Sequence, residues 1–524
     1  MGQSVIESII HFHDLGSGTS GYGSDLSRGT IPAFMEILRT LVLKNWDGGH
    51  EVKRWNVIGA ALEMMEDLHD DPNTRHLLSF PFIFRDEDIV SYFRAINFAA
   101  MSRCFSSAGN NYHLQAKFRN HFVDRRWAGY LDQHYSVASS RYLVLDIRRS
   151  HVLEDTLDQL WGLEKRQLLR PLKVRMGADE GERGVDQGGV TQEFFKVALA
   201  EAFNPDNGMF TLDPTTRMAW FQPLSVAPLS HFQLIGLLFS LALYNGVTLP
   251  VTFPLALYAH LLSLPCTDIA DGWPEIARSF DYILSSTEDI AETLSCGYEF
   301  AFEARGQTFH INMQHDQVHL PSPQTIFDYN EEVWATGHPI VWPIPLRKED
   351  EAGFVTNENR DQYVKDYTHW LTYESVAPQL DAFAEGFATC VPAPSLSILS
   401  PTLLRSIIEG TTVIDTHALE RVTCYEAGYH AKHPFIKTFW KLVHSYSNEE
   451  KRRLLEFVTA SDRVPVQGIE KVAFWVQRNG PDEECLPTSS TCFGRLLLPE
   501  YKGEGKLRRK LGIALENSRG FGSA

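Results

Sequence analysis

One cysteine, Cys492, stands in a sequence context that suits covalent chemistry. It belongs to residues 486–493, LPTSSTCF, a polar stretch between two segments that resemble strands. A thiol in such a loop is accessible, and its thiolate is a strong nucleophile. A cysteine without a disulfide partner is otherwise a small apolar core residue, so the local sequence alone leaves both interpretations open.

Glycines and histidine pairs are the other candidates for chemistry. Residues 181–189, GERGVDQGG, are not spaced as G-x-G-x-x-G and are not followed by Gly-Lys-Ser/Thr, so they predict a tight turn rather than a phosphate site. His315 with His319, and His430 with His433, have spacings that suit a metal, but no cysteine or carboxylate set completes either pair. We therefore predict no metal site and no cofactor.

Composition and charge indicate a globular protein and argue against nucleic-acid binding. The 524 residues are 44% hydrophobic and 22% charged, which is typical of a globular protein of two to four structural units. The 48 basic and 66 acidic side chains give a formal charge of -18, which opposes a phosphate backbone. Nucleic-acid binding is therefore disfavoured.

Cysteine use and hydropathy indicate the compartment. The seven cysteines show neither CxxC pairs nor the density of a disulfide scaffold, so we expect a reducing compartment, the cytoplasm and/or the nucleus. The N-terminus lacks the basic and apolar regions of a secretory signal. The most apolar stretch, residues 232–249, contains polar side chains and meets Pro250, which predicts a buried helix and no membrane span.

Periodicity predicts the elements that position these residues. Residues 1–30 are rich in Gly and Ser towards their end and predict a flexible segment, whereas residues 31–141 show mainly helical spacing. Residues 172–176 alternate like a strand, and a helix with a wide apolar face around Phe194 follows the glycine-rich turn. At residues 408–412, glycine and β-branched residues interrupt a helical pattern, which predicts a junction or hinge.

The C-terminal residues combine strands with a closing helix. Residues 474–476 and 496–498 predict two strands on either side of Cys492. Residues 506–517 predict an amphipathic helix, whose inward positions are Leu507, Leu511, Ala514 and Leu515.

Two runs of residues near the C-terminus, PTSSTCF at 487–493 and LPEY at 498–501, resemble the signature around the catalytic cysteine of HECT ubiquitin ligases. The resemblance extends from about residue 142 to the end and is closest to the branch containing the Angelman-syndrome ligase. Further motifs stand in the family's order, at residues 184–195, 204–210, 232–245, 355–360, 383–387 and 457–466.

The resemblance implies an α+β fold with two lobes. The N-lobe, residues 142–409, would be largely helical and would contain a small subdomain at about 253–368 that binds the ubiquitin-conjugating enzyme. A hinge at 410–412 would lead to an α/β C-lobe, residues 413–524. Residues 1–30 and 31–141 would then be a flexible N-terminus and a helical extension, of which the first 78 residues match no substrate-recognition module.

The resemblance also implies roles for individual residues. Cys492 would carry ubiquitin as a thioester, with Thr491 and Phe521 in support. The hinge would consist of Gly410, Thr411 and Thr412. The groove for the conjugating enzyme would involve Ile276, Phe280 and Ile283 on one helix and Tyr363 and Tyr367 on another. Spacings of 4, 3 and 4 put each set on one helix face, which suits a groove and also a core.

The implied activity is that of a ubiquitin ligase, which accepts ubiquitin from a charged conjugating enzyme and passes it to substrate lysines without a cofactor. Two residues depart from the family pattern: Ser490 replaces a common histidine, and Gly494 replaces the usual asparagine. These departures motivate an alternative, a degenerate HECT-like scaffold that binds the conjugating enzyme or ubiquitin. A cysteine hydrolase would need a histidine base near Cys492, and the sequence has no such Cys/His signature.

Overall fold

The computed structural model describes residues 86–122, 140–177, 189–266, 268–304, 307–314, 353–391, 393–466, 468–480 and 484–517. The chain divides into two compact units, Met1–Ala99 and Ala100–Ala524. Of the first unit, the description covers only residues 86–99, the first part of helix α4 (Asp86–Phe122). The predictions for residues 1–85 and for Phe521 therefore lie outside the described residues.

The second unit opens with two parallel strands. Strand β1 (Leu143–Ile147) pairs with β2 (Leu172–Met176) in parallel, in register from Leu143 opposite Leu172. Parallel neighbours need a crossover, which α6 (Val152–Leu160) and α7 (Lys165–Leu168) provide. The strand predicted at 172–176 is confirmed.

The predicted helix after the glycine-rich segment is α8 (Gly189–Ala202). Its apolar face is buried as the periodicity predicts, and it consists of Phe194, Phe195, Ala198, Leu199 and Ala202. The glycine-rich residues themselves, 178–188, lie outside the described residues.

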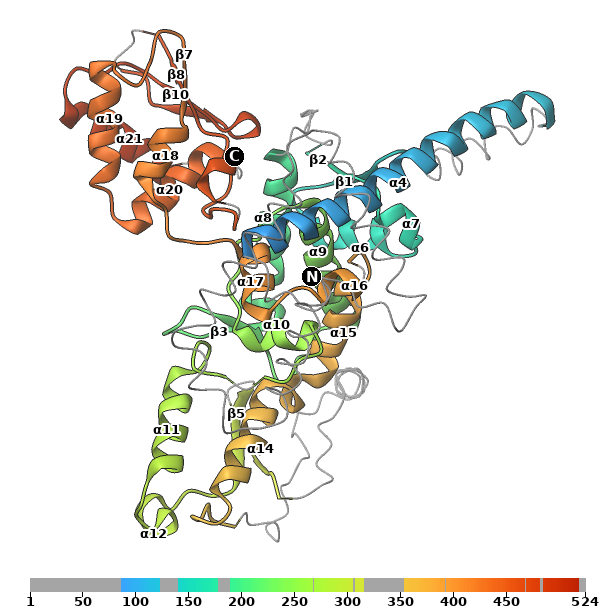
Figure 1. The fold of residues 1–524 in the computed structure, drawn as a ribbon, viewed down its shortest axis with the longest axis vertical. Coiled ribbons are helices and arrows are strands. Elements are labelled where there is room, and N and C mark those ends of the chain that lie inside the picture. Colours follow the sequence, from blue (N-terminus) through green and yellow to red (C-terminus); the bar gives the residue numbers. More distant parts are fainter. Residues whose placement is uncertain are drawn as a thin grey trace, which may run out of the picture. The chain divides into compact units, whose positions relative to one another are not determined.

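Helices α9 (Leu229–Asn245) and α15 (Ala377–Phe387) form the centre of this part of the molecule and lie side by side (Figure 1). A Cβ at Gly236 would lie 1.9 Å from the carbonyl oxygen of Phe383, so only glycine allows the two backbones to approach this closely. The buried helix predicted at 232–249 is confirmed as α9. None of the helices in the described ranges is both long and apolar enough to cross a bilayer.

Shorter elements complete the region around α9 and α15. They are η4 (Pro205–Asn207), β3 (Phe210–Leu212), β4 (Ala219–Phe221), α10 (Leu255–Leu261), η5 (Glu374–Val376), α16 (Ala393–Leu396) and α17 (Pro401–Glu409). Strands β3 and β4 pair antiparallel.

A separate group of elements has two small cores of its own. The elements are α11 (Pro274–Ser285), α12 (Ile290–Leu294), β5 (Glu299–Ala304), β6 (Gln307–Asn312) and α14 (Arg360–Thr372). One core gathers around Phe280 and Tyr363, and the other around Phe300 and Ile311. Leu224 joins the second core from outside the range 253–368, so the packing does not stop at that boundary.

The C-terminal elements surround a four-stranded sheet. They are α18 (Thr416–Val422), β7 (Cys424–Glu426), α19 (Pro434–His444), α20 (Asn448–Thr459), η6 (Ile469–Lys471), β8 (Trp475–Arg478), β9 (Thr488–Ser490), η7 (Thr491–Phe493), β10 (Arg495–Leu498) and α21 (Glu504–Asn517). The strand order is β7-β8-β10-β9, with β9 antiparallel to β10 and the other neighbours parallel.

One hydrophobic core, from Ile414 to Leu515, holds these C-terminal elements together. We call them the C-lobe, and we call the elements from β1 to α17 the N-lobe. The strands predicted at 474–476 and 496–498 are confirmed within one or two residues as β8 and β10. Helix α21 buries all four predicted inward positions. The fold is mixed α+β, consistent with the bilobal HECT architecture.

Candidate active site

The turn that carries Cys492 is a short 3-10 helix, η7, between strands β9 and β10. The pair of Ser490 opposite Arg495 closes the antiparallel ladder immediately beside this turn. Prediction of a loop over 486–493 was therefore wrong for residues 488–490, which form β9. The error has a physical cause, because this short polar strand exists only through its pairing with β10. The side chain of Cys492 lies outside the described residues.

Gly494 shapes the end of this turn. Its φ is +58°, a left-handed conformation that favours glycine and tolerates asparagine. A Cβ here would lie 2.0 Å from the carbonyl oxygen of Ala473, so no side chain fits. The Gly494 carbonyl accepts a 2.8 Å hydrogen bond from the Trp475 amide, which fixes the approach. The departure from the family's asparagine therefore follows from local packing in this chain.

Neighbouring elements place the turn near the N-lobe. Helix α20 and the N-lobe helix α8 both lie beside η7. Lys196 of α8 and Glu456 of α20 form an ion pair with Nζ and Oε1 2.5 Å apart, which joins the two lobes on this side. Phe493 is half exposed, whereas Thr491 is partly buried.

The other cysteines differ in their surroundings. Cys390 is fully buried, and burial raises the pKa of its thiol to about 12, so it stays protonated at neutral pH. Burial also raises the pKa of Cys266. Cys424 and Cys485 are exposed and belong to the C-lobe, so they are natural controls for Cys492.

The predicted hinge lies directly after α17. Gly410 has φ +65° and ψ -163°, a conformation essentially restricted to glycine. Thr411 exchanges two backbone hydrogen bonds with Val464 of the C-lobe, at 2.8 and 2.9 Å. Thr412 is exposed. The three residues line a pocket of about 370 Å³ at the surface, and the hinge assignment itself stays a prediction.

A buried charged network adjoins this junction, and no spacing in the sequence predicts it. Glu409 accepts hydrogen bonds from the Phe253 amide at 2.8 Å and from the Tyr258 hydroxyl at 2.7 Å. Burial raises the pKa of Glu409, although these two bonds and the charges of Arg405 and Arg463 act to lower it. The hydrogen bonds and the nearby arginines therefore offset only part of the desolvation cost of the carboxyl group.

Arg463 extends this network from the C-lobe to the N-lobe. Its Nη2 donates to Thr252 Oγ1 at 2.9 Å, and its Nη1 donates to the Glu409 carbonyl at 3.4 Å. The same Nη1 lies 3.9 Å from Glu409 Oε2. Because these residues are up to 211 positions apart in sequence, spacing could not have revealed the contact.

The structure brings together all five residues predicted to form the groove for the conjugating enzyme. Three are buried in one core, with 7% of Phe280, 5% of Ile283 and 5% of Tyr363 exposed. Ile276 and Tyr367 pack against that core and are partly buried. For the three buried residues, the exposure favours the core interpretation that the helical spacing left open.

Four large apolar residues close to this core are exposed, and sequence reasoning missed them. They are Tyr282, Leu284, Leu294 and Phe354, with 48%, 38%, 40% and 58% exposed. Tyr282 and Leu284 flank Ile283 on α11, so an apolar run on an amphipathic helix was the available signal. Exposed apolar side chains are typical of an interaction surface where they form one patch.

Only one of the two histidine pairs that were considered as metal ligands lies within the described residues. His315 and His319 lie outside the described residues. His430 and His433 have ring centroids 5.6 Å apart at 79°, and His433 Nδ1 accepts a hydrogen bond from the Phe435 amide. Within the described residues one group could hold a metal, His417, Glu420 and His444 in the C-lobe.

Comparisons with known proteins agree with this geometry. A family model described as HECT-domain (ubiquitin-transferase) matches residues 196–524, which include Cys492. The chain is 33% identical over 397 residues to "Probable E3 ubiquitin-protein ligase HECTD2" of Homo sapiens, covering 73% of this chain and 46% of that protein.

Two more relatives extend the comparison. The chain is 32% identical over 382 residues to "Probable E3 ubiquitin-protein ligase HERC4" of Homo sapiens, covering 72% of this chain and 33% of that protein. It is 28% identical over 398 residues to "Probable E3 ubiquitin-protein ligase HUL4" of Eremothecium gossypii, covering 73% and 43%. The chain thus spans between a third and a half of the length of these relatives. It belongs to the HECT-domain (ubiquitin-transferase) family.

Proposed function

We propose that this chain is a HECT-type ubiquitin ligase that accepts ubiquitin from a conjugating enzyme as a thioester on Cys492 and transfers it to substrate lysines. The observation that carries the proposal is the family match over residues 196–524, which contains Cys492. The turn η7, beside the N-lobe helix α8, supports it because a transferred group must be reachable from both lobes.

The chemistry needs little beyond a thiolate and proximity. The Cys492 sulfur attacks the carbonyl carbon of the incoming thioester, and the thiolate of the conjugating enzyme leaves. A lysine amine then attacks the new thioester, the Cys492 thiolate leaves, and the amine proton passes to solvent. A thiol of pKa near 8.5 is only about 3% thiolate at neutral pH, but the thioester is already activated. Positioning of the lobes then dominates the rate.

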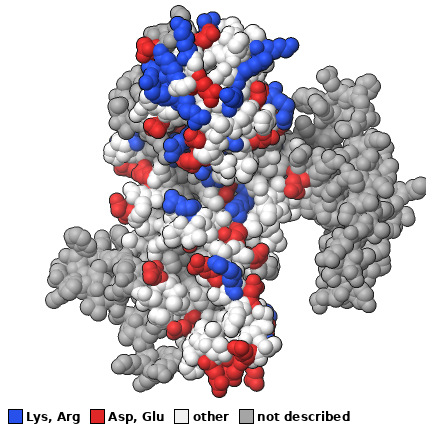
Figure 2. Space-filling view, turned by 90° about the vertical axis from the view of Figure 1, so that its left-hand side faces the viewer, with Lys and Arg blue, Asp and Glu red and all other residues white. Residues whose placement is uncertain are grey.

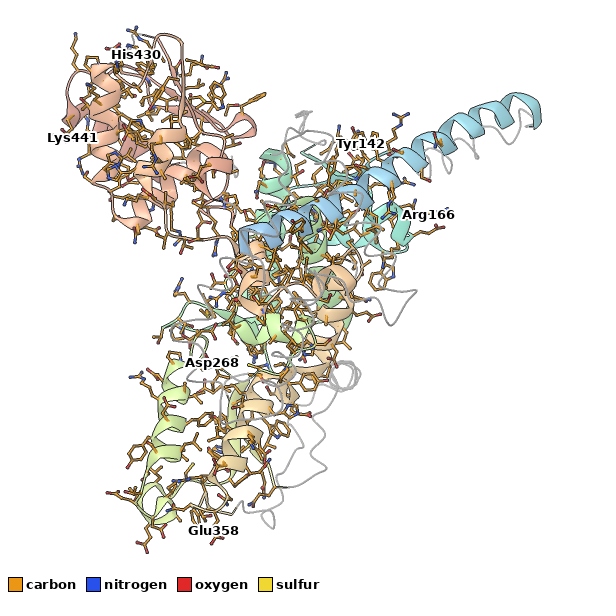
Figure 3. All side chains as sticks on the ribbon, in the orientation of Figure 1. Tyr142, Arg166, Asp268, Glu358, His430 and Lys441 are labelled. Carbon is orange, nitrogen blue, oxygen red and sulfur yellow. The ribbon has the colours of Figure 1, made fainter. Side chains whose placement is uncertain are left out.

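The exposed apolar side chains of α11, α12 and Phe354 are the best candidate surface for the conjugating enzyme. Exposed acidic residues lie near them in the sequence, namely Asp281, Glu288, Asp289, Glu292 and Glu358. Figure 2 shows acidic side chains gathered at the lower end of the view, and Figure 3 labels Glu358 there. Exposed apolar side chains with acidic residues near them in the sequence suit a partner with apolar anchors and basic neighbours.

Cysteine variants test the central proposal. The full chain is incubated with activating enzyme, conjugating enzyme and ubiquitin, and a non-reducing gel reports the thiol-sensitive adduct. Cys492→Ala should abolish the adduct, whereas Cys485→Ala, the exposed control, should retain it. Cys492→Ser should give an oxyester that resists thiols, because oxygen is the poorer leaving group. A reducible adduct in Cys492→Ala would refute the assignment, and no adduct in the wild type would favour the degenerate scaffold.

Surface and core variants separate the two interpretations of the groove. Tyr282→Ala should weaken binding of the conjugating enzyme and leave stability unchanged, while Trp161→Ala, which changes a somewhat more exposed aromatic in the N-lobe, should change neither. Phe280→Ala should instead destabilise the fold by about 3–5 kcal/mol, as for buried aromatics. Full binding by Tyr282→Ala would remove this surface from the proposal.

Further parts of the proposal concern organisation and context. The division at residues 142, 253–368 and 410–412 is supported by the separate cores on either side of the junction. The proposed partners are ubiquitin and a conjugating enzyme that carries it. The proposed location is the cytoplasm and/or the nucleus. A place near the branch containing the Angelman-syndrome ligase rests on the sequence motifs alone, and the relatives described above bear other names.

A further inference from the structure

Two histidines and a glutamate converge in the C-lobe, on elements other than the turn that carries Cys492. His417 and Glu420 lie one helical turn apart on α18, and His444 is the last residue of α19. The two helices lie side by side in the C-lobe (Figure 1). One nitrogen of each imidazole and one carboxylate oxygen all lie within 4.8 Å of one another.

The partly buried His444 is held in a defined orientation. Its Nδ1 lies 2.9 Å from Thr416 Oγ1, and its Nε2 lies 2.8 Å from Glu420 Oε2. Its ring also stacks on Trp440, with centroids 5.8 Å apart at 30°. The hydroxyl at Nδ1 orients the ring, so that Nε2 faces the carboxylate. A hydrogen bond to the nitrogen that does not bind the metal is the usual outer support of a metal-binding imidazole.

The contact between His444 and Glu420 has two descriptions, because the donor depends on the tautomer of the ring. In one, Nε2–H donates to the carboxylate and Nδ1 accepts from the Thr416 hydroxyl. A metal ion at Nε2 would require the other arrangement, in which Nδ1 donates to Thr416 and the Nε2 lone pair and the carboxylate both face the ion.

We propose that His417, Glu420 and His444 bind a divalent transition-metal ion of the Zn²⁺ class. Two imidazoles and one carboxylate are a donor set that suits Zn²⁺, and water would complete four-coordination. Metal–nitrogen bonds of about 2.0–2.1 Å place tetrahedral ligands roughly 3.3 Å apart, so the 2.8 Å contact between His444 and Glu420 must open slightly while His417 approaches.

His417 supplies the required movement. Its ring stacks on that of His444 with centroids 3.9 Å apart at 26°. Two nearly parallel rings cannot both direct a lone pair at one ion, so the His417 ring rotates on binding. The residue is exposed, and its ring is able to do so. Bound metal would join α18, the first helix after the 410–412 junction, to the end of α19 and so stiffen this side of the C-lobe.

The nearby pair His430 and His433 provides a matched control. Both precede α19, whereas His444 ends it, so the 11 residues of the helix separate the two places by about 16 Å. His430 is exposed like His417 and lies in the same lobe (Figure 3). Removing either imidazole therefore perturbs the surface to a similar degree.

Calorimetric titration of the full chain with Zn²⁺ tests the site, with Mg²⁺ as the hard-ion control and a non-thiol reductant present. His417→Ala and Glu420→Gln should each lose one equivalent of zinc or bind it at least about tenfold more weakly. His430→Ala should titrate like the wild type. The unfolding temperature should rise with Zn²⁺ in the wild type and less in His417→Ala.

Co²⁺ absorption identifies the ligands, because a thiolate gives a near-ultraviolet charge-transfer band and an imidazole–carboxylate set does not. The expected spectrum has visible ligand-field bands that His417→Ala loses. Three results would overturn the site: equal zinc binding in the wild type, His417→Ala and Glu420→Gln; loss of the site in His430→Ala; or a Co²⁺ spectrum of thiolate type alone. Since Cys492 takes no part, the result is independent of the proposed ligase activity.

Discussion

Gly410 is the residue whose replacement tests the junction most directly. Its φ of +65° and ψ of -163° lie in a region that costs a side-chain-bearing residue about 1–3 kcal/mol. A Cβ would also lie 2.6 Å from the Val464 carbonyl oxygen. Relief of that contact separates Thr411 from Val464 and loses two hydrogen bonds, each of about 1 kcal/mol. Gly410→Ala should therefore destabilise the docked lobes by about 3–5 kcal/mol.

Gly480→Ala is the matched control for this variant. Gly480 has a similar φ of +68°, and a Cβ there would meet nothing within 4 Å. Its replacement should cost only the conformational penalty, about 1–2 kcal/mol. Urea unfolding of the wild type and both variants, followed by fluorescence, measures the difference. Equal losses in the two variants would refute the reasoning, because the contact with Val464 would then contribute nothing.

Three further predictions concern the turn, the buried acid and the C-terminus. Gly494→Asn, which restores the family residue, should destabilise the C-lobe by about 1–3 kcal/mol because the side chain overlaps the Ala473 carbonyl; unchanged urea unfolding would contradict this. Burial raises the pKa of Glu409 above its ordinary 4.5, so its contribution to stability is present at lower pH and is lost as pH rises through the raised pKa. The difference in unfolding free energy between wild type and Glu409→Gln should then vary with pH above 4.5, and a constant difference would count against it. Phe521→Ala should leave loading of Cys492 nearly intact and slow discharge to lysine in single-turnover kinetics, whereas equal losses in both steps would indicate a damaged lobe.

Local periodicity was enough to predict several elements of this fold. Residues 172–176 form a strand with the predicted bounds, and α8 and α21 bury the predicted faces. Each of these signals depends on side chains within one helix or one strand. The polar strand β9 (Thr488–Ser490) depends instead on a partner, β10, and its composition gave no sign of it.

The candidate sites show the same limit. Helical spacing correctly grouped Phe280 with Ile283, and Tyr363 with Tyr367, but a shared face does not distinguish a core from a groove. Burial favours the core for Phe280, Ile283 and Tyr363, and it became visible only in the tertiary structure. The group of His417 with His444 joins two helices, so a search for short histidine spacings could not find it.

The contacts at the junction indicate which residue must act as the pivot if the C-lobe reorients. Thr411 is paired with Val464, so Thr411 would move with the C-lobe. The Gly410 amide donates to the Ser406 carbonyl of α17 at 3.0 Å, so this amide stays with the N-lobe. The rotation then falls on Gly410 alone. Proline there would need a φ near -65° and would remove that amide, so Gly410→Pro would disturb the end of α17 as well as the pivot.

Arg463 is the group that such a rotation must release. Its bonds to Thr252 and to Glu409 cross from the C-lobe to the N-lobe, and hydrogen bonds of a charged group contribute about 1.5–3 kcal/mol each. The guanidinium regains hydration when it opens, and burial already lowers its pKa, so the net cost is smaller than the sum of the bonds. A cost of about 2–3 kcal/mol would leave roughly one molecule in a hundred open, enough for exchange between loading and discharge without a large barrier. If the C-lobe reorients, the buried pair of Glu409 and Arg463 would therefore limit movement at Gly410 more than it stabilises the fold.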